Sequence, residues 1–315
     1  MDDLVVIDAN APADVFREAW KREGVLVVKG MFNADIISRT RADILRILYN
    51  SGWITNADDD HPLANLKLRC AHPDLAYLRT YRRALKIPGL YELPHCGNVD
   101  AVAGKLGMDE LFRLPRVTLR IVFPGSNPTP AHQDWATVQG YRGAATVWVP
   151  LVSCPLAMGP VTAIPGSHHQ GLWQRTSAGS LREEVVITGG GDRWVAAEIG
   201  VGDAVLFQSL TVHRAMPNVS QIMRLSIDFR MQPLDEVLHP GSLLPPEGFR
   251  TWDAVYASWT GVERQFVRYW RERHPPIEPT AGDLRRSLAQ AKKHEIPEIN
   301  GMLAQVEELT TNKVQ

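Results

Sequence analysis

Two histidines and one aspartate in the middle of the chain have the types and spacing of a metal site. His132 and Asp134 are separated by one residue in the run TPAHQDWATVQG. In an extended segment, residues i and i+2 point to the same side, so both side chains can face one ion. His213 lies far downstream in SLTVHRAMPN, just after a predicted strand. Two histidines and one carboxylate on one side of an ion leave positions open for small molecules, as in non-haem Fe(II) oxygenases.

Other histidines of the chain have simpler interpretations. A second H-x-D motif, His72-Pro73-Asp74, is predicted to begin a helix, since proline is tolerated at the first helical position and aspartate favours the positive end of the dipole. His168 and His169 follow the turn residues Pro165 and Gly166 and are interpreted as architecture. The metal site is therefore predicted from His132, Asp134 and His213 alone.

An arginine and a hydroxyl side chain follow at a spacing that suits a carboxylate ligand. Arg224 lies 11 residues after His213, and Ser226 comes two residues later in the predicted strand RLSIDFRM. A guanidinium binds a carboxylate through two parallel hydrogen bonds, and the neighbouring hydroxyl can add a third. Asp228 and Arg230 share this face, and the sequence leaves open whether they face a cavity or solvent.

The elements that must position these residues change character along the chain. Residues 1–115 are predicted to be a mainly helical flank, with helices at 12–23, 33–50, 73–86 and 99–106 and a strand at 24–28. Residues 116–232 contain short β-rich runs separated by glycine and proline, which predict a sandwich or barrel. Together they form one catalytic domain, 1–232. Residues 233–315 are predicted to be a helical extension packed on this core.

Aromatic residues mark the beginning of that extension. Their spacing is close to that of one helical face, and they are Trp252, Tyr256, Trp259, Phe266 and Trp270. Such a stripe either packs against the core, which we favour, or forms a homodimer interface. A second periodic face, formed by Arg79, Arg82, Arg83 and Lys86, is either solvated or attracts an anionic substrate.

Composition excludes several classes of function. The 315 residues carry a net charge of −1, so no basic field favours nucleic acid or a membrane surface. The cysteines, Cys70, Cys96 and Cys154, are far apart, which argues against a disulfide framework and for a reducing compartment. The N-terminus has no signal-peptide pattern, and no apolar run can span a bilayer. We therefore expect a cytoplasmic protein that acts on a small molecule.

Five segments between Arg116 and Pro233 together resemble the phytanoyl-CoA dioxygenase-like family of Fe(II)/2-oxoglutarate-dependent oxygenases. In chain order they are HQDW, VWVPL, GPVTAIPGSHHQGL, GDAVLFQSLTVHRAMPN and RLSIDFR. The resemblance implies a mixed α and β fold, with a double-stranded β-helix (a jelly-roll, cupin-like barrel) flanked by helices. It also implies that His132, Asp134 and His213 hold Fe(II), with 2-oxoglutarate and O₂ as cosubstrates.

The same resemblance implies roles for further residues, with no catalytic side chain beyond the metal centre. Arg224 and Ser226 would bind the C5 carboxylate of 2-oxoglutarate. Other residues of the cosubstrate pocket would be Gln133, Thr118 and Arg120. Substrate contacts would come from Trp148, Trp135, Gln139 and Tyr141. The lysine that contacts the cosubstrate in the family has no counterpart upstream.

The implied activity is oxidation of a small organic metabolite, as in secondary metabolism, with release of succinate and CO₂. Hydroxylation is the default outcome, while desaturation, epoxidation and ring closure remain open, as do the substrate and its attachment to a carrier or to CoA. Halogenating relatives lack the carboxylate ligand, so Asp134 indicates an oxygenase. Two alternatives from other classes remain. One is a metal-binding barrel without 2-oxoglutarate, such as a hydrolase or isomerase, and the other is a non-catalytic ligand-binding relative.

Overall fold

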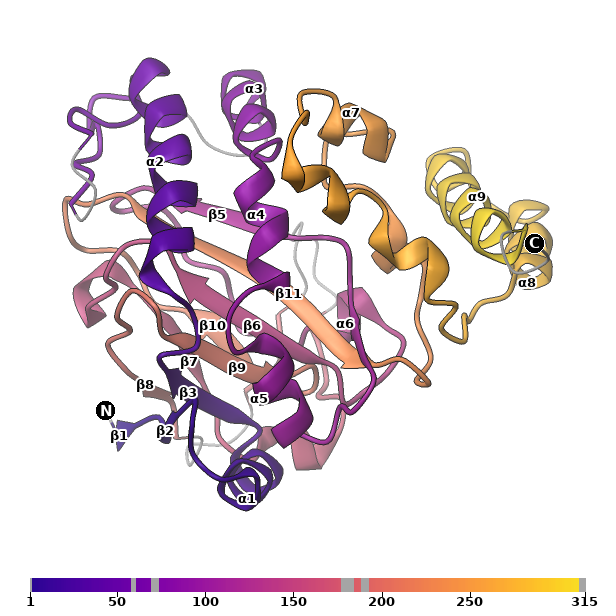
Figure 1. The fold of residues 1–315 in the computed structure, drawn as a ribbon, viewed down its shortest axis with the longest axis horizontal. Helices are drawn as coiled ribbons and strands as arrows, with labels where there is room; N and C mark the ends of the chain where they lie inside the picture. Colours follow the sequence, from indigo (N-terminus) through magenta and orange to yellow (C-terminus); the bar gives the residue numbers. More distant parts are fainter. Residues whose placement is uncertain (1, 58–60, 69–73, 177–183, 188–192, 312–315) are drawn as a thin grey trace.

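The computed structural model describes residues 2–57, 61–68, 74–176, 184–187 and 193–311 and has a mixed α and β fold with two sheets (Figure 1). The large sheet has the strand order β2 (Val6–Asp8), β3 (Val25–Lys29), β9 (Ala204–Gln208), β6 (Ala145–Pro150), β11 (Arg224–Pro233) and β4 (Leu111–Arg113), and β5 (Thr118–Val122) also pairs with β11. The small sheet has the order β1 (Asp2–Asp3), β8 (Val195–Ala196), β7 (Val161–Ala163) and β10 (His213–Ala215).

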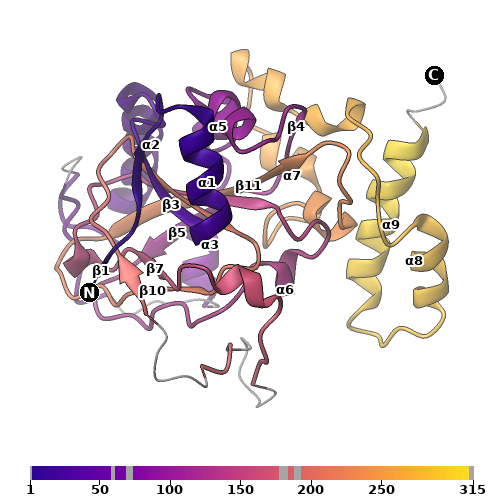
Figure 2. The same cartoon turned by 90° about the horizontal axis from the view of Figure 1, so that it is seen from below.

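The large sheet lies between two covering layers. Figure 2 shows the N-terminal helices on one side of it and the strands of the small sheet on the other. All six residues of β6 are accordingly buried, because both of its faces are covered. In β5 burial alternates instead, with Leu119 and Ile121 in the core and Thr118, Arg120 and Val122 half-buried. The polar face of β5 therefore points to the space between the two sheets, which is where a site can form.

The N-terminal helices include the four that were predicted, and the ends of those four lie within two residues of the predicted ends. They are α1 (Ala13–Glu23), α2 (Ala34–Asn50), α3 (Leu75–Ala84), α4 (Pro88–Glu92) and α5 (Val99–Lys105), with a 3-10 turn η1 (Leu93–His95). Asn33 caps α2 as expected, because its side chain accepts a hydrogen bond from the Asp35 amide at 2.8 Å. The predicted strand at 24–28 is β3. Pro73, which was expected to begin α3, lies outside the described residues.

The C-terminal extension is helical, but the aromatic stripe does not lie on one helix. It is divided among α7 (Trp252–Tyr256), η5 (Val262–Phe266) and η6 (Tyr269–Glu272), and α8 (Ala281–Leu288) and α9 (Ile296–Thr311) follow. The single-helix expectation was wrong because residues 257–261 and 267–268 interrupt the helical backbone. The tryptophans at 252, 259 and 270 are nevertheless buried in the main core. Their packing against the core is confirmed, whereas a dimer through the C-terminal helices stays a prediction.

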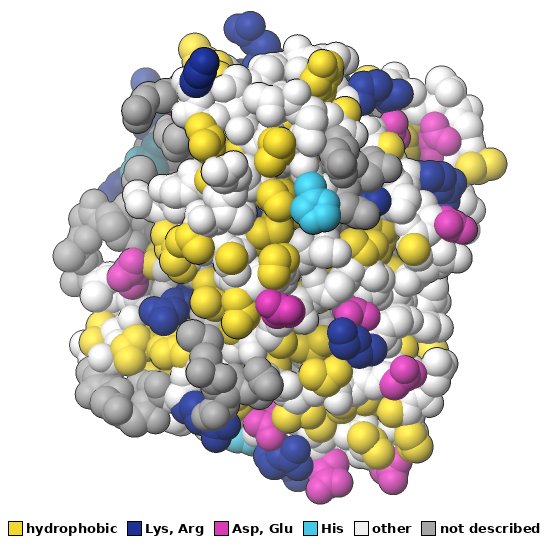
Figure 3. Space-filling view, turned by 90° about the vertical axis from the view of Figure 1, so that its left-hand side faces the viewer, with side chains coloured by type: hydrophobic (Ala, Val, Ile, Leu, Met, Phe, Trp, Pro, Cys, Tyr) yellow, Lys and Arg dark blue, Asp and Glu magenta, His cyan; other side chains and the backbone are white. Residues whose placement is uncertain are grey.

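Short elements complete the chain. They are α6 (Trp135–Val138), η2 (Leu156–Met158), η3 (Ser167–Gln170) and η4 (Pro240–Leu243). Cys96 and Cys154 are free thiols, and Cys70 lies outside the described residues. Within the described chain, no helix has the length and apolar character needed to cross a bilayer. On the face drawn in Figure 3, acidic and basic side chains are interspersed, so that face has no patch of a single charge.

Candidate active site

Backbone pairing between two distant segments brings the predicted metal ligands together. His132 and His213 form an antiparallel bridge in which each amide donates to the other residue's carbonyl, at 2.9 and 3.0 Å. Asp134 then begins the short helix α6, with φ −59° and ψ −35°. The expectation of an extended segment through Asp134 was therefore wrong, because the chain turns into α6 at this residue. The carboxylate still faces the two histidines.

The ligand atoms of the three residues surround one point. The Nε2 atoms of His132 and His213 lie 3.6 and 3.9 Å from Asp134 Oδ1, and the ligand atoms are all within 4.8 Å of one another. Both distances are shorter than about twice the 2.0–2.2 Å that such atoms keep from a bound ion such as Zn²⁺. One cation can thus contact all three atoms.

Hydrogen bonds on the far side of each imidazole fix which nitrogen is free. His132 Nδ1 lies 2.9 Å from the Pro130 carbonyl oxygen, and His213 Nδ1 lies 3.0 Å from the Thr211 carbonyl oxygen. A carbonyl only accepts, so each Nδ1 carries the proton and each Nε2 keeps its lone pair. Burial lowers the pKa of His213 to about 3, and His132 adds to this effect while Asp134 opposes it. His213 is therefore neutral at neutral pH, as a metal ligand must be.

The second carboxylate oxygen of Asp134 is held by the large sheet. Oδ2 accepts hydrogen bonds from Thr146 Oγ1 at 2.6 Å and from Arg230 Nη2 and Nε at 2.8 and 3.1 Å. Burial raises the pKa of Asp134, but Arg230 and the two histidines outweigh it and hold the pKa well below its usual value. Oδ1 is left to face the imidazoles. The sequence placed Arg230 on the right face but did not indicate this pair.

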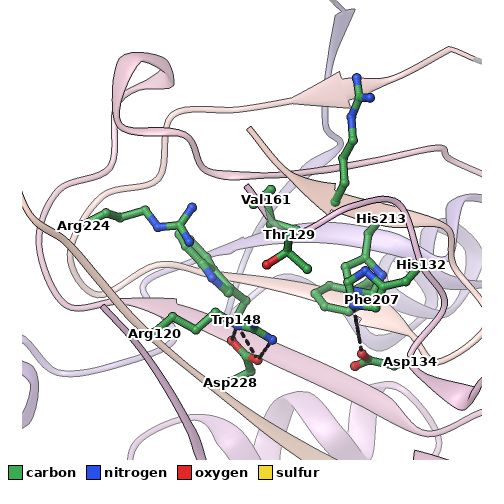
Figure 4. Close-up of a pocket in the computed structure, with 12 residues that line it drawn as sticks. Arg120, Thr129, His132, Asp134, Trp148, Val161, Phe207, His213, Arg224 and Asp228 are labelled. Atoms are coloured by element: carbon green, nitrogen blue, oxygen red, sulfur yellow. Dashed lines mark hydrogen bonds and ion pairs between the residues drawn. The ribbon is translucent and has the colours of Figure 1, made fainter. Parts of the chain in front are cut away.

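Arg224 lies in a small cavity beside these ligands (Figure 4). The cavity has a volume of about 30 Å³ and is lined by Arg224, Arg120, Asp228 and Trp148 as well as by the three ligands. In Figure 4 Arg224 and Arg120 lie on one side and the ligands on the other, with Thr129 between them. Arg120 forms an ion pair with Asp228, whose Oδ2 accepts hydrogen bonds from Arg120 Nη2 at 2.6 Å and from Arg120 Nε at 2.9 Å.

Arg224, by contrast, lacks an acidic partner within ion-pair distance among the described residues. It is 2% exposed, Nη1 donates to the Gly159 carbonyl, and Nε has no hydrogen-bond partner. Ser226 Oγ, fully buried on the same face of β11, also has none. Burial lowers the pKa of the Arg224 guanidinium to about 10. A buried cation and an unpaired hydroxyl are costly without an anionic or polar ligand, so these residues suit a carboxylate.

The other predicted site residues are distributed over several environments. Trp148 lines the small cavity, whereas Thr118 and Gln139 line a larger one that also reaches His132 and Asp134. Gln133 borders the larger cavity too, but its amide donates to the Gly171 and Leu210 carbonyls and accepts from the Trp173 amide. Both amide hydrogens are thereby used to hold backbone.

Two predicted substrate residues line neither cavity. Trp135 Nε1 donates to the Gly140 carbonyl at 2.9 Å, and the Arg142 guanidinium lies 4.8 Å from its ring. Tyr141 is half-buried, and its amide donates to the Val237 carbonyl. These contacts order the segment after α6. Substrate contact by either residue is not supported by this geometry.

The residues set aside in the sequence lie elsewhere. His168 Nε2 is 3.1 Å from the Lys21 carbonyl oxygen, and its ring lies 4.0 Å from that of His169, away from the three ligands. His72 and Pro73 are outside the described residues. The basic side chains of α3 line neither cavity, and Lys86 instead lies over the Phe249 ring. The α3 face therefore does not border the pocket.

Known proteins give these features a family. The profile of the Phytanoyl-CoA dioxygenase (PhyH) family matches residues 20–226, about two thirds of the chain. The 1-deoxypentalenic acid 11-beta-hydroxylase of Streptomyces arenae is 28% identical over 116 residues, 33% of this chain and 41% of the relative. The Streptomyces exfoliatus hydroxylase of the same name is 29% identical over 119 residues, with the same coverage. The chain thus matches less than half the length of these relatives.

Solved structures that match part of this chain include two enzymes named for nogalamycin. The epimerase SnoN, in complex with Fe³⁺ and alpha ketoglutarate, has a TM-score of 0.49 and 21% identity over 75% of this chain and 87% of its own. The carbocyclase SnoK has a TM-score of 0.49 and 18% identity over 72% and 88%. Since the family profile covers both the HxD motif and the distal histidine, the chain belongs to the phytanoyl-CoA dioxygenase family.

Proposed function

We propose that this protein hydroxylates a small organic metabolite at the centre formed by His132, Asp134 and His213. As a member of the phytanoyl-CoA dioxygenase family, it is an Fe(II)/2-oxoglutarate-dependent oxidoreductase. The observation that carries the proposal is the convergence of two imidazole lone pairs and one carboxylate oxygen within 4.8 Å. Fe(II), bound together with 2-oxoglutarate and O₂, supplies the oxidising chemistry that converts a C–H bond to C–OH while 2-oxoglutarate becomes succinate and CO₂.

The residues present fit these groups. Two imidazoles and one carboxylate are the donor set that non-haem Fe(II) prefers. Arg224 Nε and Ser226 Oγ are buried and without protein partners, so they can bind the distal carboxylate of 2-oxoglutarate. Arg120 is the weaker candidate for this contact because Asp228 already neutralises it. A barrel that does not use 2-oxoglutarate would have no use for the uncompensated Arg224, which disfavours the hydrolase and isomerase alternative.

Side chains around the centre orient the ligands and exclude water. Arg230 and Thr146 hold Asp134 Oδ2, which turns Oδ1 toward the histidines. The Phe207 ring packs 4.1 Å from that of His213, and Trp148 and Val161 complete an apolar wall. A rigid, dry site of this kind limits side reactions of a strong oxidant. Gln139, in the larger cavity, is proposed to contact the substrate, and Thr118, which the resemblance assigned to the cosubstrate pocket, lines the same cavity.

We also propose that the two sheets form the double-stranded β-helix expected from the sequence. After β5 and β6, which are both in the large sheet, the chain passes back and forth between the sheets: β7 and β8 are in the small sheet, β9 is in the large sheet, β10 is in the small sheet and β11 is in the large sheet. The His132–His213 bridge adds one more rung to the small sheet.

Hydroxylation is preferred to other outcomes because the Streptomyces relatives are 11-beta-hydroxylases. The test is Fe(II)-dependent formation of succinate from 2-oxoglutarate by the full-length protein. His132→Ala and His213→Ala should each abolish it while thermal denaturation still shows a folded protein. His169→Ala, an exposed histidine away from the centre, is the matched control. Full activity in either ligand variant would refute the assignment.

A further inference from the structure

The larger cavity contains a cation that the proposed centre does not use. The cavity has a volume of about 570 Å³, and its wall includes Arg116, Arg230, His239, Ser242 and Glu298 in addition to His132 and Asp134. Because His132 and Asp134 border this cavity, it is the space that a substrate must occupy to reach the centre. Three of these residues, His239, Ser242 and Glu298, come from the C-terminal extension, which therefore forms part of the substrate wall.

Most arginines around this space are matched by a carboxylate or held by other contacts. Arg230 is paired with Asp134 and Arg120 with Asp228, and Arg175, which also lines the cavity, has contacts of its own. Arg116 differs, because its nearest partners are neutral. Its Nη2 and Nε donate to the Gly241 and Leu244 carbonyls at 3.1 and 3.4 Å, and no described carboxylate lies within 4.0 Å of it.

The electrostatic surroundings of Arg116 are those of an incompletely compensated charge. Burial lowers the pKa of its guanidinium, and the Arg230 cation lowers it further, while Glu298 and Glu247 act in the opposite direction from a longer range. Nη1 makes no hydrogen bond to a described residue. An anion in the cavity would offset both the desolvation and the repulsion.

Arg116 lies at an irregularity in the sheet, and its side chain lines the larger cavity. Between Arg113, paired with Met231, and Thr118, paired with Asp228, the chain advances five positions while β11 advances three. The two extra residues form a bulge, a feature that re-aims side chains and is frequent beside active sites. Arg116 lies within it, and its Cα is at most about 14 Å from that of Arg120. The hydrogen bonds to the Gly241 and Leu244 carbonyls hold the guanidinium in the cavity wall.

We infer that Arg116 binds a single anionic group of the substrate, such as a carboxylate, in the larger cavity. The inference rests on the proposed function for calling the occupant a substrate. Arg230 and Arg120 in the same wall are already paired with carboxylates, so the substrate class that Arg116 suits is an organic acid with one anionic group. Arg116 lines only the larger cavity, whereas Arg224 lines only the smaller one, which separates this anion from the carboxylate of 2-oxoglutarate.

A matched pair of fluorescent probes tests the inference. Anilinonaphthalene sulfonate carries one negative charge, and phenylnaphthylamine has the same rings without it. Binding of both to the full-length protein is measured with and without anaerobic Fe(II) and 2-oxoglutarate. Arg116→Gln should weaken binding of the sulfonate by about 10- to 100-fold, the loss expected for a charge-assisted hydrogen bond, and leave phenylnaphthylamine within about two-fold. Arg83→Gln, the same change on exposed α3, should alter neither.

A second variant covers the case in which Arg116→Gln does not fold. Glu298→Gln removes the negative charge from the same wall, so it should tighten sulfonate binding several-fold and leave phenylnaphthylamine unchanged. The inference is overturned if sulfonate binding is unchanged in Arg116→Gln, if both probes weaken equally, or if Glu298→Gln weakens the sulfonate. Probe binding does not require iron, so these results are independent of the succinate assay, whose failure would refute the proposed function instead.

Discussion

Among the described residues, Arg230 is the one arginine or lysine within hydrogen-bond distance of the buried Asp134 carboxylate, and Arg230→Met removes it. The Asp134 side chain is 6% exposed and that of Arg230 is 12% exposed, so the pair is largely buried, with both side chains at the wall of the larger cavity. Breaking a buried ion pair costs about 3–5 kcal/mol, because the remaining charge stays desolvated. Thr146 still donates one hydrogen bond to Oδ2, so we expect the lower end, about 3 kcal/mol. This corresponds to a fall in Tm of about 6–12 °C.

The free energy of unfolding is measured by urea denaturation of the metal-free protein. Arg39→Met is the control, because Arg39 is 70% exposed and lies 3.6 Å from Glu92, and such surface pairs contribute about 0–1 kcal/mol. The pH dependence gives a second readout. The pKa of Asp134 is lowered in the folded state, so its stabilisation is present above the unfolded pKa of about 3.9 and is lost progressively as pH falls from there through the lower folded-state pKa. The deficit of Arg230→Met should therefore be full at pH 7 and shrink below about pH 4.

Addition of a divalent metal gives a third comparison. A bound dication supplies positive charge next to Asp134, so the deficit of Arg230→Met should be smaller in the metal-loaded protein than in the metal-free one. A deficit at pH 7 no larger than that of Arg39→Met would refute this reasoning. So would a deficit that grows as the pH is lowered below about 4, since protonation of Asp134 removes the charge that needs a cation.

Three further outcomes are expected. Arg224→Lys should raise the KM for 2-oxoglutarate by about ten-fold or more with unchanged Fe(II) affinity, because lysine keeps the charge but loses the fork; an unchanged KM would point to another anchor. Burial, with a contribution from Arg113, lowers the pKa of His95 to about 4, so the free energy of unfolding should fall as pH drops from about 6.5 to 4. His95→Phe should flatten this decline, whereas the control His294→Gln should not. Equal slopes in the two variants would contradict the prediction. Turnover in chloride should give no chlorinated product, since Asp134 occupies the position that a halide would need, and mass spectrometry of the product decides this.

Local pattern was enough to predict several helices and the three donor residues that converge in the fold. The helices at α1 and α2, the cap at Asn33 and the metal ligands followed from periodicity, capping chemistry and the spacing of donor atoms. These features depend on residues close in sequence or on donor types that few other functions require. Arg224 and Ser226 were also found from local pattern, because residues i and i+2 of a strand point to the same face.

Features that depend on tertiary contact were not predicted. The Arg230–Asp134 pair joins residues 96 positions apart. The sequence indicated only that Arg230 shares one face of a strand with Arg224. The bulge at Arg116 arises from the pairing with β11, which no local pattern encodes. The aromatic stripe was wrongly assigned to one helical face, because buried aromatic side chains at helical spacing also occur in short turns that pack on a core. The contribution of the C-terminal extension to the larger cavity had no sequence signal that we can identify.

Anaerobic absorption spectroscopy tests the central assignment most directly. Fe(II) is added to the full-length protein, 2-oxoglutarate follows, and the visible spectrum is recorded before and after. The wild type should develop the weak charge-transfer band of an Fe(II)–2-oxoglutarate complex, and so should His169→Ala, whereas His213→Ala should not. A wild type without the band, or a His213→Ala variant with the full band, would contradict the assignment of iron and 2-oxoglutarate to this site.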